Sequence, residues 1–144
     1  MKHVSHLLEA KGRPVWSLPP NATVYEAIDQ MAQKGIGALL VMEGEHLIGI
    51  IPERDYAREV ILKGKVAQET KVREIMSYPV HCARPELTVE RAMALMTERS
   101  VRHLPVVVAD RVVGVISMGD VVRGIIEDKQ FYIQQLTNYV TGSR

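Results

Sequence analysis

The 144-residue sequence has little of what marks several large protein classes. Cys82 is its single cysteine, so no internal disulfide framework can form. The formal net charge is +1, which gives no electrostatic drive toward nucleic acid or an anionic membrane. No apolar run approaches the roughly 20 residues that a membrane-spanning helix needs, and Met1–Ala10 does not resemble a signal peptide. These absences predict a soluble cytoplasmic protein with neither a nucleic-acid nor a membrane partner.

The motifs of common enzymes are also missing. There is no Walker phosphate loop, no GxGxxG fingerprint and no GxSxG nucleophile turn. No pair of carboxylates stands out as a general acid and base, and the one suggestive histidine spacing, His3-x-x-His6, lacks a third metal ligand. We therefore predict that the protein is not an enzyme and holds no metal. Nucleotide hydrolysis is the weakest of the alternatives.

What the sequence does contain is an internal repeat. At an offset of about 65 residues, a length too great for one solenoid unit, the second half of the chain matches the first without a gap. Pairs of identical residues include Thr23 with Thr88, Met31 with Met96, Gly49 with Gly114 and Asp55 with Asp120. Two copies of this size predict one compact domain with a pseudo-twofold axis and paired clefts.

Each copy shows the same order of patterns, β-α-β-β-α, preceded by a short helical lead. The leads are Val4–Leu8 and Val72–Met76, and the first extended pieces are Val15–Leu18 and Val80–Ala83. Apolar residues at helical spacing then follow Thr23 and Thr88, which are typical helix caps. Two short apolar runs around a tight turn predict a hairpin in each copy. Second helices are expected at about Glu53–Leu62 and Met118–Glu127.

These patterns divide the chain into four parts. We predict the first repeat at 4–64, a polar linker at 65–71, the second repeat at 72–128, and a C-terminal helix and tail at 129–144. Within the last part, Lys129–Val140 is predicted to be an extra helix with an apolar side. Three roles are open for it: docking a partner, extending a dimer, or covering an apolar edge of the module.

The repeat and three motifs of the second copy resemble the cystathionine-β-synthase (CBS) domain pair, or Bateman module. The motifs are Val72-Arg73-Glu74-Ile75-Met76, Val101-Arg102-His103-Leu104-Pro105-Val106 and Gly114-Val115-Ile116-Ser117-Met118-Gly119-Asp120. The resemblance covers about residues 4 to 128. It implies an α/β (α+β) fold of two β-α-β-β-α repeats packed through their sheets, clefts for adenosine-containing ligands, and a homodimer formed through helices.

The stretch Gly-x-x-Ser-x-x-Asp in the second copy predicts a helix N-terminus, which favours a phosphate. The resemblance implies that Ser117 binds the phosphate and that Asp120 accepts hydrogen bonds from the ribose hydroxyls. The intervening Met118 and Gly119 would let the backbone approach the ligand. The alternative is a plain capping box that forms without any ligand.

The first copy departs from this pattern because Pro52 stands where Ser117 stands in the second. Proline has neither an N–H nor a hydroxyl, so this cleft is expected to lack one phosphate contact. Asp55 is retained, and Arg54 either compensates as a forked phosphate donor or is a solvated charge. The asymmetry predicts two non-equivalent sites, the Arg54/Asp55 cleft being the better one for a dinucleotide.

Further ligand contacts are expected near the starts of strands. Arg102 and His103 face the cleft in the family, whereas the first copy has Gly37 and Ala38 there. The alternative for this pair is a surface arginine beside a half-buried histidine. Val15 and Val80 are expected to line the slots for adenine, although both would be core valines in any fold.

The main functional hypothesis is a regulatory module that binds adenine nucleotides and relays energy or redox state to an unknown regulated protein. AMP is the favoured ligand, with ADP, ATP, NAD(H) or S-adenosylmethionine as alternatives. The rival hypothesis is a dimerisation or interaction module that binds no nucleotide. Pro52 favours the rival for one cleft, and the complete Ser117–Asp120 motif argues against it for the other.

Overall fold

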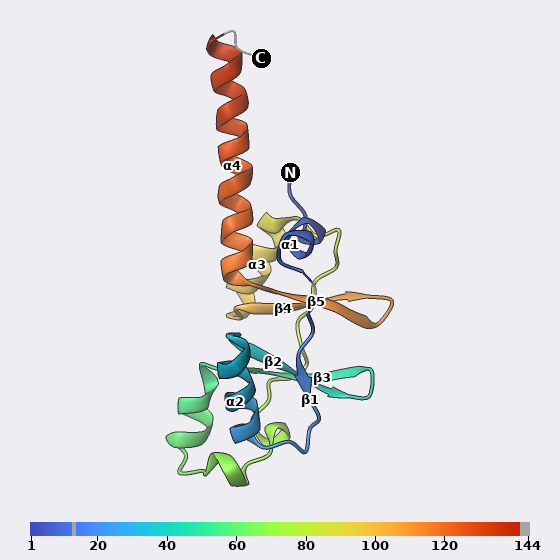
Figure 1. Cartoon of the computed structure of the whole chain (residues 1–144), viewed down its shortest axis with the longest axis vertical. Helices are drawn as coiled ribbons and strands as arrows, with labels where there is room; N and C mark the ends of the chain where they lie inside the picture. Colours follow the sequence, from blue (N-terminus) through green and yellow to red (C-terminus); the bar gives the residue numbers. More distant parts are fainter. Residues whose placement is uncertain (13, 142–144) are drawn as a thin grey trace. The chain divides into compact units, whose positions relative to one another are not determined.

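The computed structural model describes residues 1–12 and 14–141, which form two compact units (Figure 1). Unit 1 contains the described residues of Met1–Arg13, Cys82–Val108 and Val113–Arg144. Unit 2 contains Pro14–His81 together with Ala109–Val112. The fold is the mixed α/β arrangement that the repeat predicts, with each sequence copy supplying most of one unit.

Unit 2 is built on a three-stranded sheet in the order β1-β2-β3, formed by β1 (Ser17–Leu18), β2 (Ala38–Glu43) and β3 (His46–Pro52). Strand β1 runs parallel to β2, and β2 and β3 form the predicted antiparallel hairpin. Gly44 lies in the turn with φ of 63°, a conformation that glycine adopts without a steric penalty. Helix α2 (Val24–Lys34) buries Val24, Ala27 and Met31, the apolar stripe expected from the sequence.

The rest of unit 2 is short helical turns. The second helix of the first copy is a π-helical segment, Ala57–Ile61, with Val60 buried. The predicted linker contains a 3₁₀ turn, Ala67–Glu69, and the lead of the second copy is another, Val72–Glu74. The lead is therefore shorter than the sequence predicts.

Unit 1 repeats the pattern with α3 (Val89–Arg99) and the hairpin of β4 (His103–Val108) and β5 (Arg111–Ser117). The extended piece expected at Val80–Ala83 is not a strand. It is reduced to one parallel bridge, in which the N–H of Ala83 donates to the carbonyl of Pro105 at 2.8 Å. Pro105 in β4 has no N–H to donate to the segment Val80–Ala83, which limits any further backbone hydrogen bonding between the two.

Threonine caps begin the two long helices of the repeats, as predicted. The hydroxyl of Thr23 accepts a hydrogen bond from the N–H of Glu26, whose carboxylate accepts one from the N–H of Thr23. Thr88 accepts from the N–H of Arg91 in the same way. Because arginine cannot accept in return, the second cap has only half of the reciprocal pair.

The helical leads are exchanged between the two copies. Helix α1 (Val4–Lys11), from the start of the first copy, packs in unit 1, and Leu8 lies over Gly114 of β5. A Cβ at Gly114 would lie 2.6 Å from Leu8 Cδ2, so any larger residue there would force the leucine side chain to shift. In unit 2, Met76 lies over Gly49 of β3 so closely that a Cβ would overlap its sulfur. The compact units therefore do not coincide with the sequence repeats 4–64 and 72–128.

Backbone hydrogen bonds show that the exchange is symmetric. The N–H of Val4 donates to the carbonyl of Leu87 at 2.8 Å, and the N–H of Val72 donates to that of Ala22 at 2.8 Å. Leu87 and Ala22 occupy matching places just before the threonine caps. Each lead is thus tied to the helix cap of the other copy.

The C-terminal part differs from the prediction of two helices. Helix α4 (Met118–Thr141) continues without a break through Asp128 and Lys129. No glycine or proline interrupts 125–141, so nothing in the sequence ends a helix there. Figure 1 shows α4 extending well past α1 and α3 of its own unit. The tail at 142–144 lies outside the described residues.

Each unit has its own hydrophobic core. The core of unit 1 joins α1, α3, the β4–β5 hairpin and α4 through Leu8, Met96, Leu104, Ile116 and Val121, all at most 1% exposed. The core of unit 2 contains eleven buried residues: Ala22, Val24, Ala27, Met31, Leu39, Val41, Ile51, Val60, Ala67, Val72 and Ile75. Two separate cores fix the two sheet ends at which the candidate site residues lie.

Candidate functional site

The predicted Ser-x-x-Asp motif lies where β5 ends and α4 begins. The N–H of Asp120 donates to Ser117 Oγ at 3.1 Å, and the N–H of Ser117 donates to Asp120 Oδ2 at 2.8 Å. The N–H of Met118 donates to the carbonyl of Arg102 at 2.8 Å, which anchors the start of α4 on the start of β4. The motif therefore has the geometry of a complete reciprocal cap, which is compatible with both interpretations of the sequence.

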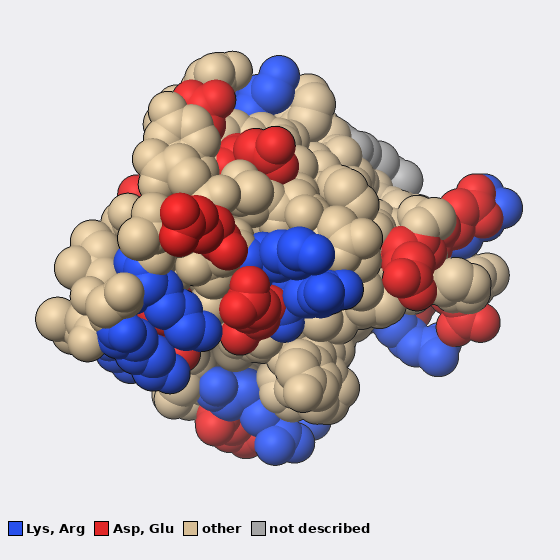
Figure 2. Space-filling view, turned by 90° about the horizontal axis from the view of Figure 1, so that it is seen from below, with Lys and Arg blue, Asp and Glu red and all other residues tan. Residues whose placement is uncertain are grey.

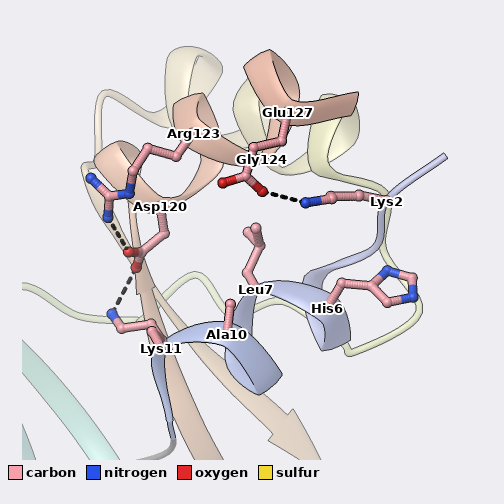
Figure 3. Close-up of a pocket in the computed structure, with 9 residues that line it drawn as sticks. All are labelled: Lys2, His6, Leu7, Ala10, Lys11, Asp120, Arg123, Gly124 and Glu127. Atoms are coloured by element: carbon pink, nitrogen blue, oxygen red, sulfur yellow. Dashed lines mark hydrogen bonds and ion pairs between the residues drawn. The ribbon is translucent and has the colours of Figure 1, made fainter. Parts of the chain in front are cut away.

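Asp120 is also the centre of an ionic cluster (Figure 3). Lys11 Nζ, at the end of α1, lies 2.7 Å from Asp120 Oδ2 and also donates to the carbonyl of Val115 at 3.1 Å. Arg123, one turn along α4, places Nη2 at 2.7 Å from Asp120 Oδ1. The carboxylate is 8% exposed, whereas the Arg123 side chain is 68% exposed. A buried anion thus holds two cations, one of them reaching into solvent.

This environment lowers the pKa of Asp120. Burial alone would raise the pKa, since it penalises the charged carboxylate. The hydrogen bond from Lys11 and the bonds from the N–H and hydroxyl of Ser117 outweigh burial, and the positive charge of Lys11 adds to them. Asp120 is therefore a firmly ionised acceptor at neutral pH, which is the state needed to bind hydroxyl groups.

The lowered pKa predicts an acid-dependent loss of stability. A carboxylate with a lower pKa in the folded state stabilises the fold above its unfolded pKa, and loses that effect as pH falls through the folded value. We expect the free energy of unfolding of the wild type to exceed that of Asp120→Asn at pH 7, and the difference to shrink below about pH 4. Urea titrations of the two proteins between pH 7 and pH 2 measure this. A difference that stays constant over that range would contradict the assigned ion pairs.

The cluster forms one end of a shallow pocket between α1 and α4 of about 150 Å³ (Figure 3). Leu7, Ala10 and Gly124 supply its apolar part, and a Cβ at Gly124 would lie 2.7 Å from Leu7 Cδ2. An ion pair between Lys2 and Glu127 closes the other end. The close helix contact at Gly124 is what brings Lys11 within reach of Asp120.

The equivalent position in unit 2 keeps the backbone anchor but not the cap. The N–H of Glu53 donates to the carbonyl of Gly37 at 2.9 Å, matching the bond from Met118 to Arg102. Pro52 ends β3 and offers no hydroxyl to the following turn. Arg54 is exposed and Asp55 is half-buried. The two copies thus present different side chains on the same backbone frame, as the sequence predicts.

The structure groups the remaining predicted residues by unit. Arg102 is exposed and His103 half-buried at the start of β4, in the same unit as Ser117, Met118, Gly119 and Asp120. In unit 2, Ala38, Val15 and Val80 are all half-buried, so neither valine is a core residue. Sequence reasoning missed Lys11 and Arg123 as partners of Asp120. Arg123 had a detectable signal, since it repeats Arg58 at the offset of the two copies, but Lys11 had none.

The surface carries mixed charge. Figure 2 shows lysine and arginine side chains interspersed with aspartate and glutamate on the face it presents. Within residues 1–12 and 14–141, no three His, Cys, Asp or Glu side chains converge as a metal site would require. Across the same residues, no helix combines the length and the apolar character needed to cross a bilayer.

Comparison with known proteins identifies the family. The model of the CBS domain matches the chain twice, at residues 9–62 and 72–127. The chain belongs to the CBS-domain family. The two matches correspond to the two copies of the repeat, so the resemblance inferred from the three motifs is confirmed.

Relatives of this CBS-domain chain include proteins of similar size. It is 37% identical over 149 residues to the CBS domain-containing protein CBSX3, mitochondrial, of Arabidopsis thaliana, covering 96% of this chain and 72% of that protein. A putative signal-transduction protein with CBS domains from Burkholderia ambifaria MC40-6 has a TM-score of 0.85 and 45% identity, over 88% of this chain and 96% of that one. The CBS domain protein PAE2072 from Pyrobaculum aerophilum, complexed with AMP, has a TM-score of 0.72 and 25% identity, over 82% of this chain and 88% of that one.

Proposed function

We propose that this CBS-domain chain is a non-catalytic regulatory module that binds an adenine nucleotide, AMP in the first place, at the N-terminus of α4. The observation that carries the proposal is the buried, ionised Asp120 next to Ser117 at the point where β5 ends and α4 begins. The relative from Pyrobaculum aerophilum, which is complexed with AMP, supports the choice of ligand. ADP, ATP, NAD(H) and S-adenosylmethionine are alternatives.

The proposed roles follow from the chemistry of each group. Asp120 would accept hydrogen bonds from the two ribose hydroxyls, which requires its partners Lys11 and Arg123 to give up part of their contact. Both cations would then be available to the phosphate, and Ser117 would add a hydroxyl donor. Arg102 and His103 at the start of β4 remain proposed contacts of the same ligand. Met118 and Gly119 would contribute backbone.

A second, weaker site is proposed in unit 2 around Arg54 and Asp55, with Ala38, Val15 and Val80 as apolar contacts. Pro52, at the position equivalent to Ser117, has no hydroxyl to donate to a phosphate. A dinucleotide that uses Arg54 is therefore favoured at this site over AMP. In this proposal, occupancy of the sites changes the shape presented to a regulated protein, which reads energy or redox state from it.

The rival function is an interaction module without a nucleotide. One observation favours it: Ser117 and Asp120 already satisfy each other, so the cap needs no ligand to explain it. A measurement of nucleotide binding distinguishes the two functions.

The test is isothermal titration calorimetry of AMP into protein stripped of nucleotide by unfolding and refolding. We expect saturable binding of one AMP per chain, and a second event with NAD that AMP competes away only partly. Ligand at 100 times its dissociation constant is expected to raise the unfolding free energy by about 2.7 kcal/mol. No heat with either ligand, and no rise in melting temperature at millimolar ligand, would overturn the proposal and favour the interaction module.

A further inference from the structure

The two oxygens of the Asp120 carboxylate are held in different ways. Oδ2 accepts from the backbone N–H of Ser117 at 2.8 Å and from Lys11 Nζ at 2.7 Å. Oδ1 accepts from Arg123 Nη2 at 2.7 Å. A carboxylate oxygen has two lone pairs, so the two bonds to Oδ2 fill its accepting capacity. Oδ1 is therefore the oxygen at which a ligand hydroxyl can take the place of a protein donor.

Lys11 is the firmly held partner of Asp120. Its ammonium group donates to the carboxylate and also to the carbonyl of Val115 on β5, at 3.1 Å. The Lys11 side chain is 35% exposed and that of Asp120 is 8% exposed. Taking the cation away from a buried carboxylate leaves an uncompensated charge, which costs far more than breaking an exposed ion pair. Lys11 is therefore the partner that a ligand displaces least readily.

Arg123 is the looser partner. Figure 3 shows it reaching Asp120 from α4, whereas Lys11 comes from α1. Its side chain is 68% exposed, and an ion pair with so much solvent contact contributes little because water screens both charges. A ribose hydroxyl that donates to Oδ1 thus replaces the arginine at small cost. The guanidinium keeps its charge and its forked donors, close to a helix N-terminus where a phosphate is favoured.

The electrostatics of Asp120 agree with this difference. Burial raises the pKa of the carboxyl, and the hydrogen bonds from Lys11 and Ser117, with the positive charge of Lys11, outweigh burial and lower it. Lys11 thus keeps the buried carboxylate ionised. The exposed Arg123 can leave the carboxylate while Lys11 and Ser117 remain in place.

The two copies of the repeat differ in one of these cations. Arg58 repeats Arg123 at the offset of 65 residues and follows Asp55 in the same way. Lys11 is not repeated. Counted from the equivalent backbone hydrogen bonds that begin the two leads, the matching place in the second lead is Pro79. An arginine after the aspartate is thus common to both copies, whereas the lysine is specific to the Asp120 site.

From these contacts we propose that the two cations have separate roles in ligand binding. Lys11 is a positioning residue, which holds Oδ2 and keeps the Asp120 carboxylate fixed for the ribose. Arg123 occupies Oδ1, gives way to the ribose and turns to the phosphate, so it is the residue that distinguishes a nucleotide from a nucleoside. This inference rests on the proposed binding of AMP, and it assigns the phosphate to one of the two available cations.

The role of Arg123 is tested by calorimetry of the full chain with AMP and with adenosine at neutral pH. Because a charge-assisted contact to the phosphate is lost, we expect Arg123→Gln to lower the ratio of AMP affinity to adenosine affinity by about 10-fold or more. The control Lys129→Gln removes an exposed cation six residues further along α4 and should keep the wild-type ratio. Equal weakening of both ligands in Arg123→Gln, or no weakening of either, would overturn the role of Arg123.

The role of Lys11 has a different signature, because it acts through Asp120. We expect Lys11→Met to weaken AMP and adenosine by the same factor, and both affinities to fall on acidification from a higher pH than in the wild type. Lys11→Arg keeps a cation at this position and should restore the wild-type pH profile. In the ligand-free protein, a carbon-13 NMR titration of the Asp120 carboxyl should show a higher pKa in Lys11→Met and a smaller change in Arg123→Gln.

The outcomes separate this inference from the proposed function. If the pKa of Asp120 in Lys11→Met equals that of the wild type, Lys11 is not its positioning residue, whether or not a nucleotide binds. If the wild type binds adenosine as tightly as AMP, the phosphate is not read and the role of Arg123 is wrong, although the adenosine site stands. If the wild type binds neither ligand, the proposed function itself fails, and the division of roles fails with it.

Discussion

Replacing Asp120 by alanine is expected to abolish measurable AMP binding while leaving a folded protein. The Asp120 carboxylate has two oxygens that can accept from the two ribose hydroxyls, and hydrogen bonds to charged groups are worth about 1.5–3 kcal/mol each. Loss of two such bonds corresponds to at least about a 100-fold weaker affinity. Calorimetry with AMP at neutral pH measures the change, and ligand-free melting of the same sample measures the fold.

The matched control is Asp29→Ala, which removes an exposed aspartate whose carboxylate accepts from Gln33 on the same helix. It should bind AMP as the wild type does. Asp55→Ala distinguishes the two proposed sites, since it should spare AMP binding at Asp120 and weaken NAD. Unchanged AMP affinity in Asp120→Ala would remove Asp120 from the site, even if the wild type binds AMP.

Truncating Leu8 is expected to have the largest effect on stability. Leu8 is 1% exposed and packs α1 onto Gly114 in the core of unit 1. Leucine-to-alanine changes in such cores cost about 2–5 kcal/mol, because transfer free energy is lost and a cavity remains. Chemical unfolding of Leu8→Ala measures the cost, and hydrogen exchange should place most of the lost protection in unit 1.

A double-mutant cycle tests the contact itself. Gly114→Ala alone should destabilise, since its Cβ would lie 2.6 Å from Leu8 Cδ2. Combined with Leu8→Ala, the added methyl would occupy vacated space, so the two costs should not add and the coupling should be about 0.5–3 kcal/mol. Leu62→Ala, at 76% exposure, is the control for leucine truncation and should be near neutral. Additive costs would show that α1 does not pack on Gly114.

Much of this architecture was predictable because it rests on short-range patterns. The stripes at Val24–Met31 and Val89–Met96, with threonine in front of each, fix two helices by periodicity and capping alone. The repeat and its motifs were sufficient to indicate the family. The Ser117–Asp120 pair was predicted with its two possible meanings, and the structure contains the capping geometry that either requires.

What escaped prediction depends on long-range contacts. Lys11 pairs with Asp120 across more than a hundred residues of sequence, and nothing around Lys11 marks it as a partner. The exchange of leads was equally hidden, because Leu8 and Met76 have the same apolar character whichever sheet they cover. The prediction of two helices separated near Asp128 was wrong for a local reason, because neither Asp128 nor Lys129 is a residue that ends a helix.

The exchanged leads also have a consequence for synthesis. Unit 2 is nearly continuous in the chain, whereas unit 1 is split, with α1 at one end and β5 and α4 at the other. A ribosome adding about 5–20 residues per second would release Leu8 roughly 5–20 s before Gly114. Over that interval α1 exists as a nascent segment without its docking surface, while Pro14–His81, the main part of unit 2, has already been synthesised. The order of emergence therefore makes unit 2 the earlier-folding half and leaves α1 as the part most exposed to chaperones and proteases.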